Sequence, residues 1–238
     1  MKNLKFFEPN DNTNGNDINT DQNGGNSNTG SDNATGTANG HEWVDLGLPS
    51  GLKWATCNVG ATKPEEYGDY FAWGETEPKT TYDWSTYKYG SDYDELTKYC
   101  NKASYGKDSF TDDKTVLDPE DDAARANWGG QWRMPTDGEW GELLDECTWE
   151  WKNGYKGTTA GYLVTSKING NSIFLPAAGY RFDDDLYFAG YYGSYWSSSL
   201  YTGDPYYAWY VYFYSDGVRR RSGYRYFGLS VRPVLFGE

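Results

Sequence analysis

The chain has 238 residues, a formal net charge of -14 at neutral pH and an aromatic content of 18%. The acidic balance argues against a general nucleic-acid-binding protein, because such a protein needs Lys and Arg to neutralise phosphates. No apolar run approaches the roughly 18 residues that a membrane span requires. We therefore expect neither nucleic-acid binding nor a membrane span.

The chain begins with a segment of low complexity. Residues 10–40 are almost entirely Asn, Gly, Thr, Ser and Asp. Such a segment cannot bury enough apolar surface to offset the entropy lost on ordering it. We expect residues 1–40 to form a disordered tail or linker. The composition change at His41 marks the predicted start of a single domain over residues 41–238.

Short strands are predicted from His41 onward, because apolar and aromatic runs are separated by turns rich in Gly and Asp. The sequence shows no internal repeat. The candidate strands are Trp43–Leu46, Lys53–Asn58, Tyr70–Trp73, Gly161–Ile168, Ser172–Leu175, Tyr195–Ser198, Tyr207–Tyr214 and Leu229–Leu235.

Two helices are predicted from their start signals. Asp118 is a candidate N-cap and Pro119 suits the first helical position, ahead of Ala123–Ala126. Thr136 and Glu139 have the spacing of a capping box, and apolar residues follow at helical spacing. Because strands dominate and helices are few, we predict an α+β class that is strand-rich with two main helices.

Residues that usually carry catalysis or hold metals are few. The cysteines Cys57, Cys100 and Cys147 form no CxxC pair. Buried free thiols are the favoured interpretation, and one disulfide with one free thiol is the alternative. The sole histidine, His41, is interpreted as a linker residue at the domain boundary. One histidine and scattered cysteines form no Ser-His-Asp set or zinc cluster, so we predict no catalytic residue, no metal ligand and no cofactor.

Acidic runs offer oxygen atoms that could hold calcium. For Asp183–Asp185, an exposed acidic turn is the favoured interpretation over a calcium site. The acids of Asp118–Asp122 are accounted for by a helix start. We therefore predict no structural calcium.

Four segments carry a resemblance to a known fold. The run Trp132–Trp140, WRMPTDGEW, resembles the strand-to-helix junction of C-type-lectin-like domains of the formylglycine-generating-enzyme type. Leu175–Arg181, Tyr195–Ser199 and Ser230–Val234 also resemble segments of that family. The resemblance implies a C-type-lectin-like fold for residues 41–238.

The C-terminal stretch resembles a narrower family, the variable proteins of diversity-generating retroelements. In that family, adenines of a template copy are randomised, so AAC codons of the variable repeat become other codons while a constant frame persists. The resemblance implies a variable region at about residues 195–234. The frame residues here are Trp196–Ser199, Ala208, Trp209, Val211, Phe213, Ser215, Arg220, Arg225, Gly228 and Ser230–Arg232.

Between the frame residues stand only residues that an Asn codon can reach through adenine changes. No Asn occurs from Ser172 onward, although the first forty residues are rich in it. The resemblance therefore implies that these positions contact ligand. They are Tyr201, Thr202, Gly203, Asp204, Tyr206, Tyr207, Tyr210, Tyr212, Tyr214, Gly217, Arg219, Arg221, Ser222, Gly223, Tyr224, Tyr226 and Phe227.

Alternation along Tyr207–Tyr214 supports an exposed tyrosine stripe independently. A strand places alternate residues on opposite faces. One face would hold the scaffold residues Trp209, Val211 and Phe213, and the other Ala208, Tyr210, Tyr212 and Tyr214. Tyr207 falls with the scaffold set by alternation, but the codon argument makes it a contact residue. Arg219–Arg221 and Arg225 are expected to form a basic patch beside the stripe. A stripe packed inside the domain is the alternative.

These patterns predict a ligand-binding protein, receptor-like or adhesin-like, since Tyr, Ser, Gly and Arg dominate binding surfaces. The expected partner is a protein or glycan on another cell or host surface. The family places such proteins outside the cell, on a bacterial surface or a phage particle. A formylglycine-generating-type oxidoreductase is one alternative, but it needs a cysteine pair in the C-terminal half, where only Cys147 occurs. A structural or assembly protein is the other. The oligomeric state stays open.

Overall fold

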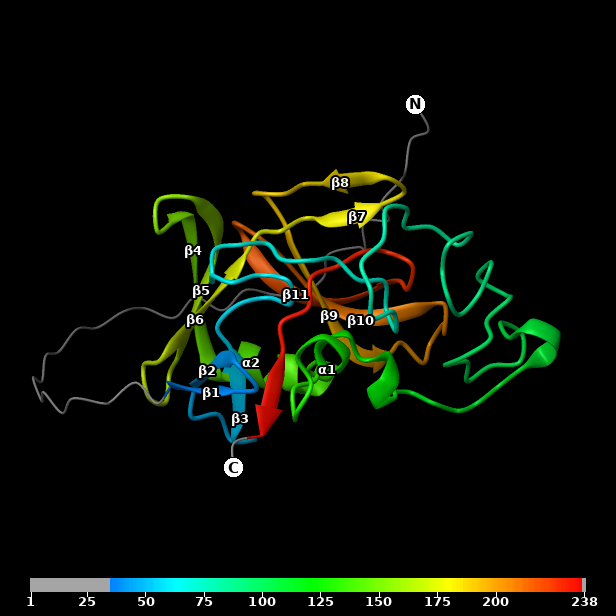
Figure 1. Cartoon of the computed structure of the whole chain (residues 1–238), viewed down its shortest axis with the longest axis horizontal. Coiled ribbons are helices and arrows are strands. Elements are labelled where there is room, and N and C mark those ends of the chain that lie inside the picture. The colour runs from blue at the N-terminus through cyan, green and yellow to red at the C-terminus, as the bar shows by residue number, and fades with distance from the viewer. Residues whose placement is uncertain (1–34, 237–238) are drawn as a thin grey trace, which may run out of the picture. The chain divides into compact units, whose positions relative to one another are not determined.

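The computed structural model describes residues 35–236, and Figure 1 shows how their elements are arranged. Most of the predicted tail, residues 1–34, lies outside the described residues. Strands dominate and two α-helices are present, so the strand-rich α+β prediction is confirmed. The elements are β1 Thr35–Ala38, β2 His41–Asp45, β3 Leu52–Ala55, η1 Lys107–Ser109, η2 Pro119–Asp121, α1 Ala123–Trp128, α2 Asp137–Glu146, β4 Cys147–Tyr155, β5 Thr159–Ser166, β6 Ser172–Pro176, β7 Tyr180–Phe182, β8 Asp185–Tyr187, β9 Gly193–Leu200, β10 Tyr207–Tyr214, β11 Gly217–Tyr224 and β12 Val234–Phe236.

The first strand begins at Thr35, upstream of the predicted domain boundary at His41. β1 pairs antiparallel with β2 through a turn in which Asn39 and Gly40 have φ values of 49° and 82°. Two successive left-handed residues form the tight hairpin turn that Asn-Gly favours. Backbone pairing therefore extends the folded region into a polar segment, and the boundary predicted from composition is too late.

The sole histidine belongs to this hairpin. His41 lies in β2 and stacks on Trp128 with ring centroids 3.8 Å apart. Its interpretation as a linker residue is wrong, because strand pairing and this stacking place it in the fold.

A four-stranded sheet joins the two ends of the described chain. Its order is β1-β2-β3-β12, and Figure 1 shows the red β12 beside the blue β3. Val234 of β12 lies opposite Trp54 of β3, which also lies opposite Val44 of β2. All three side chains belong to one buried apolar cluster.

The capping box predicted for the second helix is confirmed in α2. The Thr136 hydroxyl accepts from the Glu139 N–H at 3.2 Å, and the Glu139 carboxylate accepts from the Thr136 N–H at 2.7 Å. Arg133 holds the same carboxylate with bonds of 2.8 and 2.6 Å. The start of α2 is therefore fixed by local hydrogen bonds.

The first helix begins later than predicted. Pro119–Asp121 forms the 3-10 turn η2, and α1 starts at Ala123. Asp122 is the N-cap, and its side chain accepts from the Arg125 N–H at 3.0 Å. Asp118, the predicted cap, makes no capping hydrogen bond, because the 3-10 turn intervenes.

Two predicted strands are shorter than expected. Tyr70–Trp73 contributes only a bridge, in which Phe71 and Leu229 exchange backbone hydrogen bonds of 3.0 and 3.1 Å. The predicted strand Leu229–Leu235 becomes regular only at β12, after Pro233. Proline has no N–H to donate to a ladder.

Several strands were not expected from the sequence, namely β1, β4, β7, β8 and β11. The clearest case is β11, whose centre is Arg219–Arg221 and which has no apolar alternation. It pairs along its whole length with β10. The neighbouring strand therefore imposes its conformation, as is usual for strand preference.

The sheet β11-β10-β9 lies between two buried apolar clusters. Val211 and Phe213 of β10 join one cluster, which also holds Tyr195. Ala208 of β10 and Trp196 of β9 join the other. This sheet carries most of the predicted contact residues, so each face must be considered separately.

Candidate ligand-binding face

The hairpin of β10 and β11 sets which side chains share a face. Tyr210 lies opposite Arg221, and Tyr212 lies opposite Arg219. Tyr214 lies opposite Gly217, so its neighbour on the partner strand has no side chain. Directly opposed residues of an antiparallel pair point to the same side. Tyr210, Tyr212, Tyr214, Arg219 and Arg221 therefore form one surface, which we call the tyrosine–arginine face.

The opposite face of the hairpin is core, as predicted for Val211 and Phe213. Both side chains are fully buried. The Phe213 ring lies 5.3 Å from the Tyr162 ring, centroid to centroid. Gly193 of β9 lies opposite Phe213, and a Cβ there would come within 1.9 Å of the Phe213 ring. Glycine is therefore required at position 193.

The core role predicted for Trp209 is wrong. Trp209 is half-buried, whereas its neighbour Ala208 is fully buried. The pairing with β9 shifts between these residues, because Ala208 opposes Leu200 while Tyr210 opposes Trp196. The extra residues of this bulge lie in β9, because β10 keeps a continuous register with β11. Trp209 therefore stays on the side of Val211 and Phe213 but lies outside the buried cluster that they join.

The three tyrosines of the face differ in burial. Tyr210 packs against Trp196 at a centroid distance of 5.8 Å. Burial raises the pKa of Tyr210 to about 12, although Arg221 acts in the opposite direction. Tyr212 lies 5.9 Å from Tyr214, ring to ring, and belongs to neither buried cluster. Tyr212 and Tyr214 are therefore the tyrosines of this face that lie outside the buried clusters.

A second group of predicted contact residues lies at the start of β10. Tyr206, Tyr207 and Tyr224 are half-buried, with ring centroids 4.4 to 6.0 Å apart. Tyr226 is only 8% exposed and lies 5.0 Å from the Trp84 ring. Tyr226 is therefore a packing residue, and its prediction as an exposed contact is wrong.

The loop before β10 carries four more of the predicted residues, Tyr201–Asp204. It is held by the segment Asn101–Tyr105. The Asn101 amide donates to the Thr202 carbonyl at 3.1 Å, and the Tyr105 hydroxyl donates to the Asp204 carboxylate at 3.1 Å. Thr202 itself is exposed. The loop thus presents a fixed polar rim.

The remaining predicted residues are Gly217, Ser222, Gly223 and Phe227. Gly217 and Ser222 are half-buried. Gly223 is buried, and a Cβ there would lie 3.0 Å from the Tyr210 ring. Phe227 is half-buried among other aromatic rings. Gly223 therefore makes room for Tyr210, and its prediction as a contact residue is wrong.

The predicted basic patch is divided between surface and core. Arg225 is fully buried and donates to the Tyr87 hydroxyl at 2.9 Å and to the Pro205 carbonyl at 2.9 Å. Arg220 is exposed, but it lies on the opposite side of the hairpin from Arg219 and Arg221 and donates to the Asp137 carboxylate at 2.8 Å. Including Arg225 in an exposed patch is therefore wrong.

Arg219 and Arg221 behave differently. Arg219 is exposed and Arg221 is half-buried. Neither side chain makes an ion pair or a hydrogen bond with any residue of 35–236. Their guanidinium groups are thus free to meet an external anion.

Sequence reasoning missed an aromatic surface beside the face. In and after the β7–β8 hairpin, Leu186, Phe188 and Tyr191 are 39%, 44% and 71% exposed. Tyr192 links this group to the sheet, because its ring lies 4.6 Å from Phe188 and 5.3 Å from Tyr212. The apolar residues around Gly190, in a turn-rich stretch, were the available signal.

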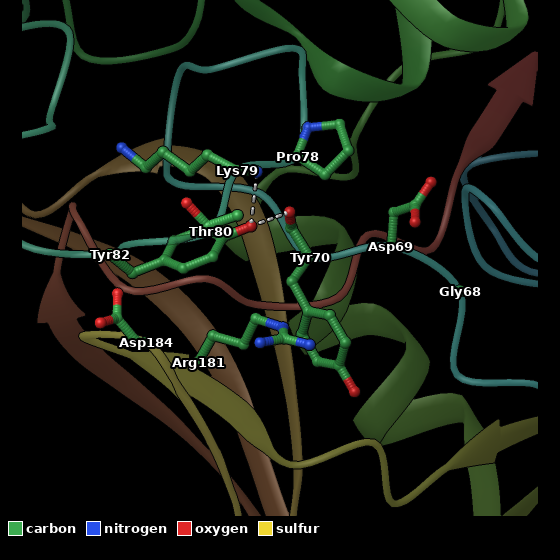
Figure 2. Close-up of a pocket in the computed structure, with 9 residues that line it drawn as sticks. All are labelled: Gly68, Asp69, Tyr70, Pro78, Lys79, Thr80, Tyr82, Arg181 and Asp184. Atoms are coloured by element: carbon green, nitrogen blue, oxygen red, sulfur yellow. Dashed lines mark hydrogen bonds between the residues drawn. The ribbon is translucent and has the colours of Figure 1, made fainter.

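A cavity of about 360 Å³ lies beside the same hairpin, and Figure 2 shows its lining. The Arg181 guanidinium lies 5.3 Å from the centroid of the Tyr70 ring. Asp69 and Asp184 bring carboxylates to the same cavity. The charges are therefore mixed, and they select neither an anion nor a cation.

Carboxylates that could hold a metal gather, within residues 35–236, at Asp118, Glu120 and Asp121. Lys98 reaches all three, with N–O distances of 2.7, 3.7 and 2.5 Å. Lys88 also pairs with Asp121 and Lys114 with Asp118, so three lysines balance the charge of the three carboxylates. The acids of Asp183–Asp185 are exposed.

The predicted free thiols are confirmed. Cys57, Cys100 and Cys147 are buried and free, so the alternative of one disulfide does not hold. Burial raises the pKa of Cys147 to about 12 and also raises the pKa of the other two thiols. All three therefore stay protonated near neutral pH.

Comparison with known proteins covers the same C-terminal region. A family model described as a domain of unknown function (DUF8237) matches residues 151–234, a stretch that includes the whole tyrosine–arginine face. No curated protein and no solved structure matches the chain. Within residues 35–236, neither helix has the length and apolar character that crossing a membrane demands.

Proposed function

We propose that the chain is a ligand-binding protein with a C-type-lectin-like fold, and that a retroelement diversifies its tyrosine–arginine face. Its partner is a protein or glycan on another cell or host surface. The protein acts outside the cell, as a receptor or adhesin on a bacterial surface or on a phage particle. Tyrosine supplies a large, amphipathic contact area at low entropic cost.

The observation that carries the proposal is that the four arginines of this region fall into two groups, those with partners inside the protein and those without. Arg220 and Arg225, which belong to the constant frame, are held by Asp137 and by buried acceptors. Arg219 and Arg221, at the codon-limited positions, have no partner in residues 35–236. A constant frame that holds the fold, with variable positions that meet a ligand, would account for this difference between the two pairs of arginines.

The test is to sequence this locus from many cells of one population. Substitutions should fall at the codons of the predicted contact positions, and adenines should occupy those sites in a second copy of the repeat beside a reverse transcriptase gene. Arg220 and Arg225 should not vary. Changes spread evenly over residues 195–234 would contradict the proposal.

An oxidoreductase of the formylglycine-generating type is less well supported. Its chemistry needs a reactive cysteine pair, whereas the described thiols are buried and protonated. Copper- and oxygen-dependent oxidation of a cysteine peptide by the purified protein would favour it. A structural or assembly role would instead require self-association through the tyrosine–arginine face.

A further inference from the structure

We infer that the ligand surface continues from the tyrosine–arginine face onto the β7–β8 hairpin, and that this combined surface binds an apolar protein patch rimmed by carboxylates. The inference rests on the proposed function. It adds to it a fixed part of the surface, Leu186–Tyr192, which lies outside the variable region, and a chemical class of partner.

The two parts are joined by an unbroken line of aromatic rings. Successive centroids are 4.6 Å apart for Phe188 and Tyr192, 5.3 Å for Tyr192 and Tyr212, and 5.9 Å for Tyr212 and Tyr214. Tyr191, 71% exposed, follows Gly190 in the same segment. A partner that covers Tyr212 therefore also meets the hairpin.

Phe188 has a left-handed backbone conformation in a turn, where its carbonyl accepts from the Tyr191 and Tyr192 N–H groups at 3.0 and 2.9 Å. Its φ is 54°, in the left-handed region that a bulky side chain rarely adopts. The ring is 44% exposed, so its burial returns only part of the cost. Strain of this kind is concentrated at binding sites.

Charge decides the class of partner. The chain carries a net charge of -14, yet the tyrosine–arginine face presents Arg219 and Arg221 without anionic partners in residues 35–236. The exposed acids of the hairpin, Asp183–Asp185, precede the Leu186–Tyr192 part of the surface. Guanidinium groups pair well with carboxylates, and Tyr and Arg dominate protein hot spots. Exposed Phe188 and Leu186 in turn need apolar groups on the partner.

A second copy of this chain fits less well. A two-fold dimer through this surface would bring the same patch of both copies together. Arg219 and Arg221 of one copy would then lie near those of the other, and like charges in an interface are unfavourable. An external acidic protein has no such conflict.

The probe is a random peptide library displayed on phage and selected against the full chain. Enriched peptides should combine Asp or Glu with apolar residues. A synthetic winner should bind Arg219→Glu and Phe188→Asn about tenfold more weakly or worse, as for hot-spot residues. Asn tolerates left-handed φ, so Phe188→Asn removes the ring and keeps the turn. Tyr191→Ser, at an exposed site, is the second hairpin variant, and Tyr212→Ser is the second variant of the tyrosine–arginine face.

Matched controls are Arg125→Glu and Phe110→Asn, which change exposed side chains elsewhere and should leave the Kd unchanged. Raising the salt concentration should slow association, because the attraction is electrostatic.

Each other outcome has a definite meaning. If binding depends on Arg219 and Tyr212 but not on Phe188 or Tyr191, the hairpin extension is wrong and the proposed function survives. If winners bind independently of all four residues, the proposed function itself fails. Winners without acidic residues, or no enrichment at all, would overturn the acidic protein partner. If the chain binds members of a glycan panel only when Arg219 and Phe188 are intact, the ligand is a sugar and not an acidic protein. If the chain self-associates and Phe188→Asn abolishes the self-association, the partner is a second copy of the chain.

Discussion

Buried charge in this protein is held by dense local contacts. Arg225 donates to the Tyr87 hydroxyl at 2.9 Å, to the Pro205 carbonyl at 2.9 Å and to the Lys98 carbonyl at 2.9 Å. Its guanidinium also lies 5.0 Å from the Trp73 ring centroid. A buried cation is tolerated only when its donors are satisfied in this way.

Replacing Arg225 with Ala should therefore destabilise the fold by about 3–5 kcal/mol, because it leaves a cavity and strips charged hydrogen bonds from buried acceptors. Arg221→Ala, on the open face, should change stability by less than about 0.5 kcal/mol. Urea unfolding of both variants measures the difference. Equal effects would mean that the two arginines are not divided between core and surface.

Asp121 is the most heavily bonded carboxylate in the described chain. Burial raises its pKa, but hydrogen bonds from Lys98, Tyr89 and Tyr99, with a further one from Lys88, outweigh burial and lower the pKa to about 2. The unfolded value is near 3.8. The carboxylate form is therefore favoured by folding.

Because the folded pKa is depressed, this stabilisation is present above pH 4 and is lost as the pH falls toward about 2. It corresponds to about 2 kcal/mol. The difference in unfolding free energy between wild type and Asp121→Asn should shrink over that pH range. Asp94→Asn, at an exposed site, serves as the control. A difference that is constant from pH 5 to pH 2 would contradict the role assigned to the carboxylate.

At the scale of elements, β10 separates scaffold from surface. Phe213 is fully buried across Gly193, whereas Tyr212 and Tyr214 contact mainly each other and Tyr192. Tyr210 is intermediate between scaffold and surface, because it packs against Trp196. All three tyrosines of the stripe are half-buried, so the prediction of an exposed stripe is wrong, and only Tyr212 and Tyr214 lie outside both buried clusters.

Phe213→Ala should cost about 3–5 kcal/mol, as a buried aromatic truncation does. The double variant Tyr212→Ser with Tyr214→Ser should cost less than about 1 kcal/mol and still abolish ligand binding. Tyr210→Ser should fall between them in stability. Thermal unfolding and a binding assay on the same samples separate the effects. If the double variant unfolds as readily as Phe213→Ala, the tyrosines are core.

At the scale of the whole molecule, the last strand closes the described chain onto its first elements. β12 pairs with β3, and Val234 and Leu235 are buried. Arg133, just before α2, also exchanges backbone hydrogen bonds with Val234, of 3.0 and 2.9 Å. Residues far apart in sequence therefore depend on this short strand.

A chain that lacks residues 233–238 should fold poorly and show no cooperative unfolding transition. The loss includes two buried apolar side chains, each worth about 1.5–3 kcal/mol, against a total stability of typically 5–15 kcal/mol. Near-ultraviolet circular dichroism and urea titration report the outcome. Phe236→Ser, at a 52% exposed site, should leave the transition intact. A sharp transition in the truncated chain would show that β12 is dispensable.

Local signals account for what could be predicted. The α2 capping box involves Thr136 and Glu139, three positions apart, and its hydrogen bonds form within one turn. The bounds of β10 match the predicted Tyr207–Tyr214, because its alternation is strong along most of its length. The Asn39-Gly40 turn was an equally local signal that composition masked.

The sequence by itself determined the α+β class, the start of α2, the extent of β10 and the burial of the three cysteines. The tertiary structure alone decided that Trp209 is half-exposed, that Tyr226 and Arg225 are buried, and that the β7–β8 hairpin adjoins the tyrosine–arginine face. The reason is physical. Capping and alternation depend on neighbours within a few residues, whereas burial depends on which distant segment packs against a side chain, and the register shift opposite Trp209 belongs to its partner strand β9.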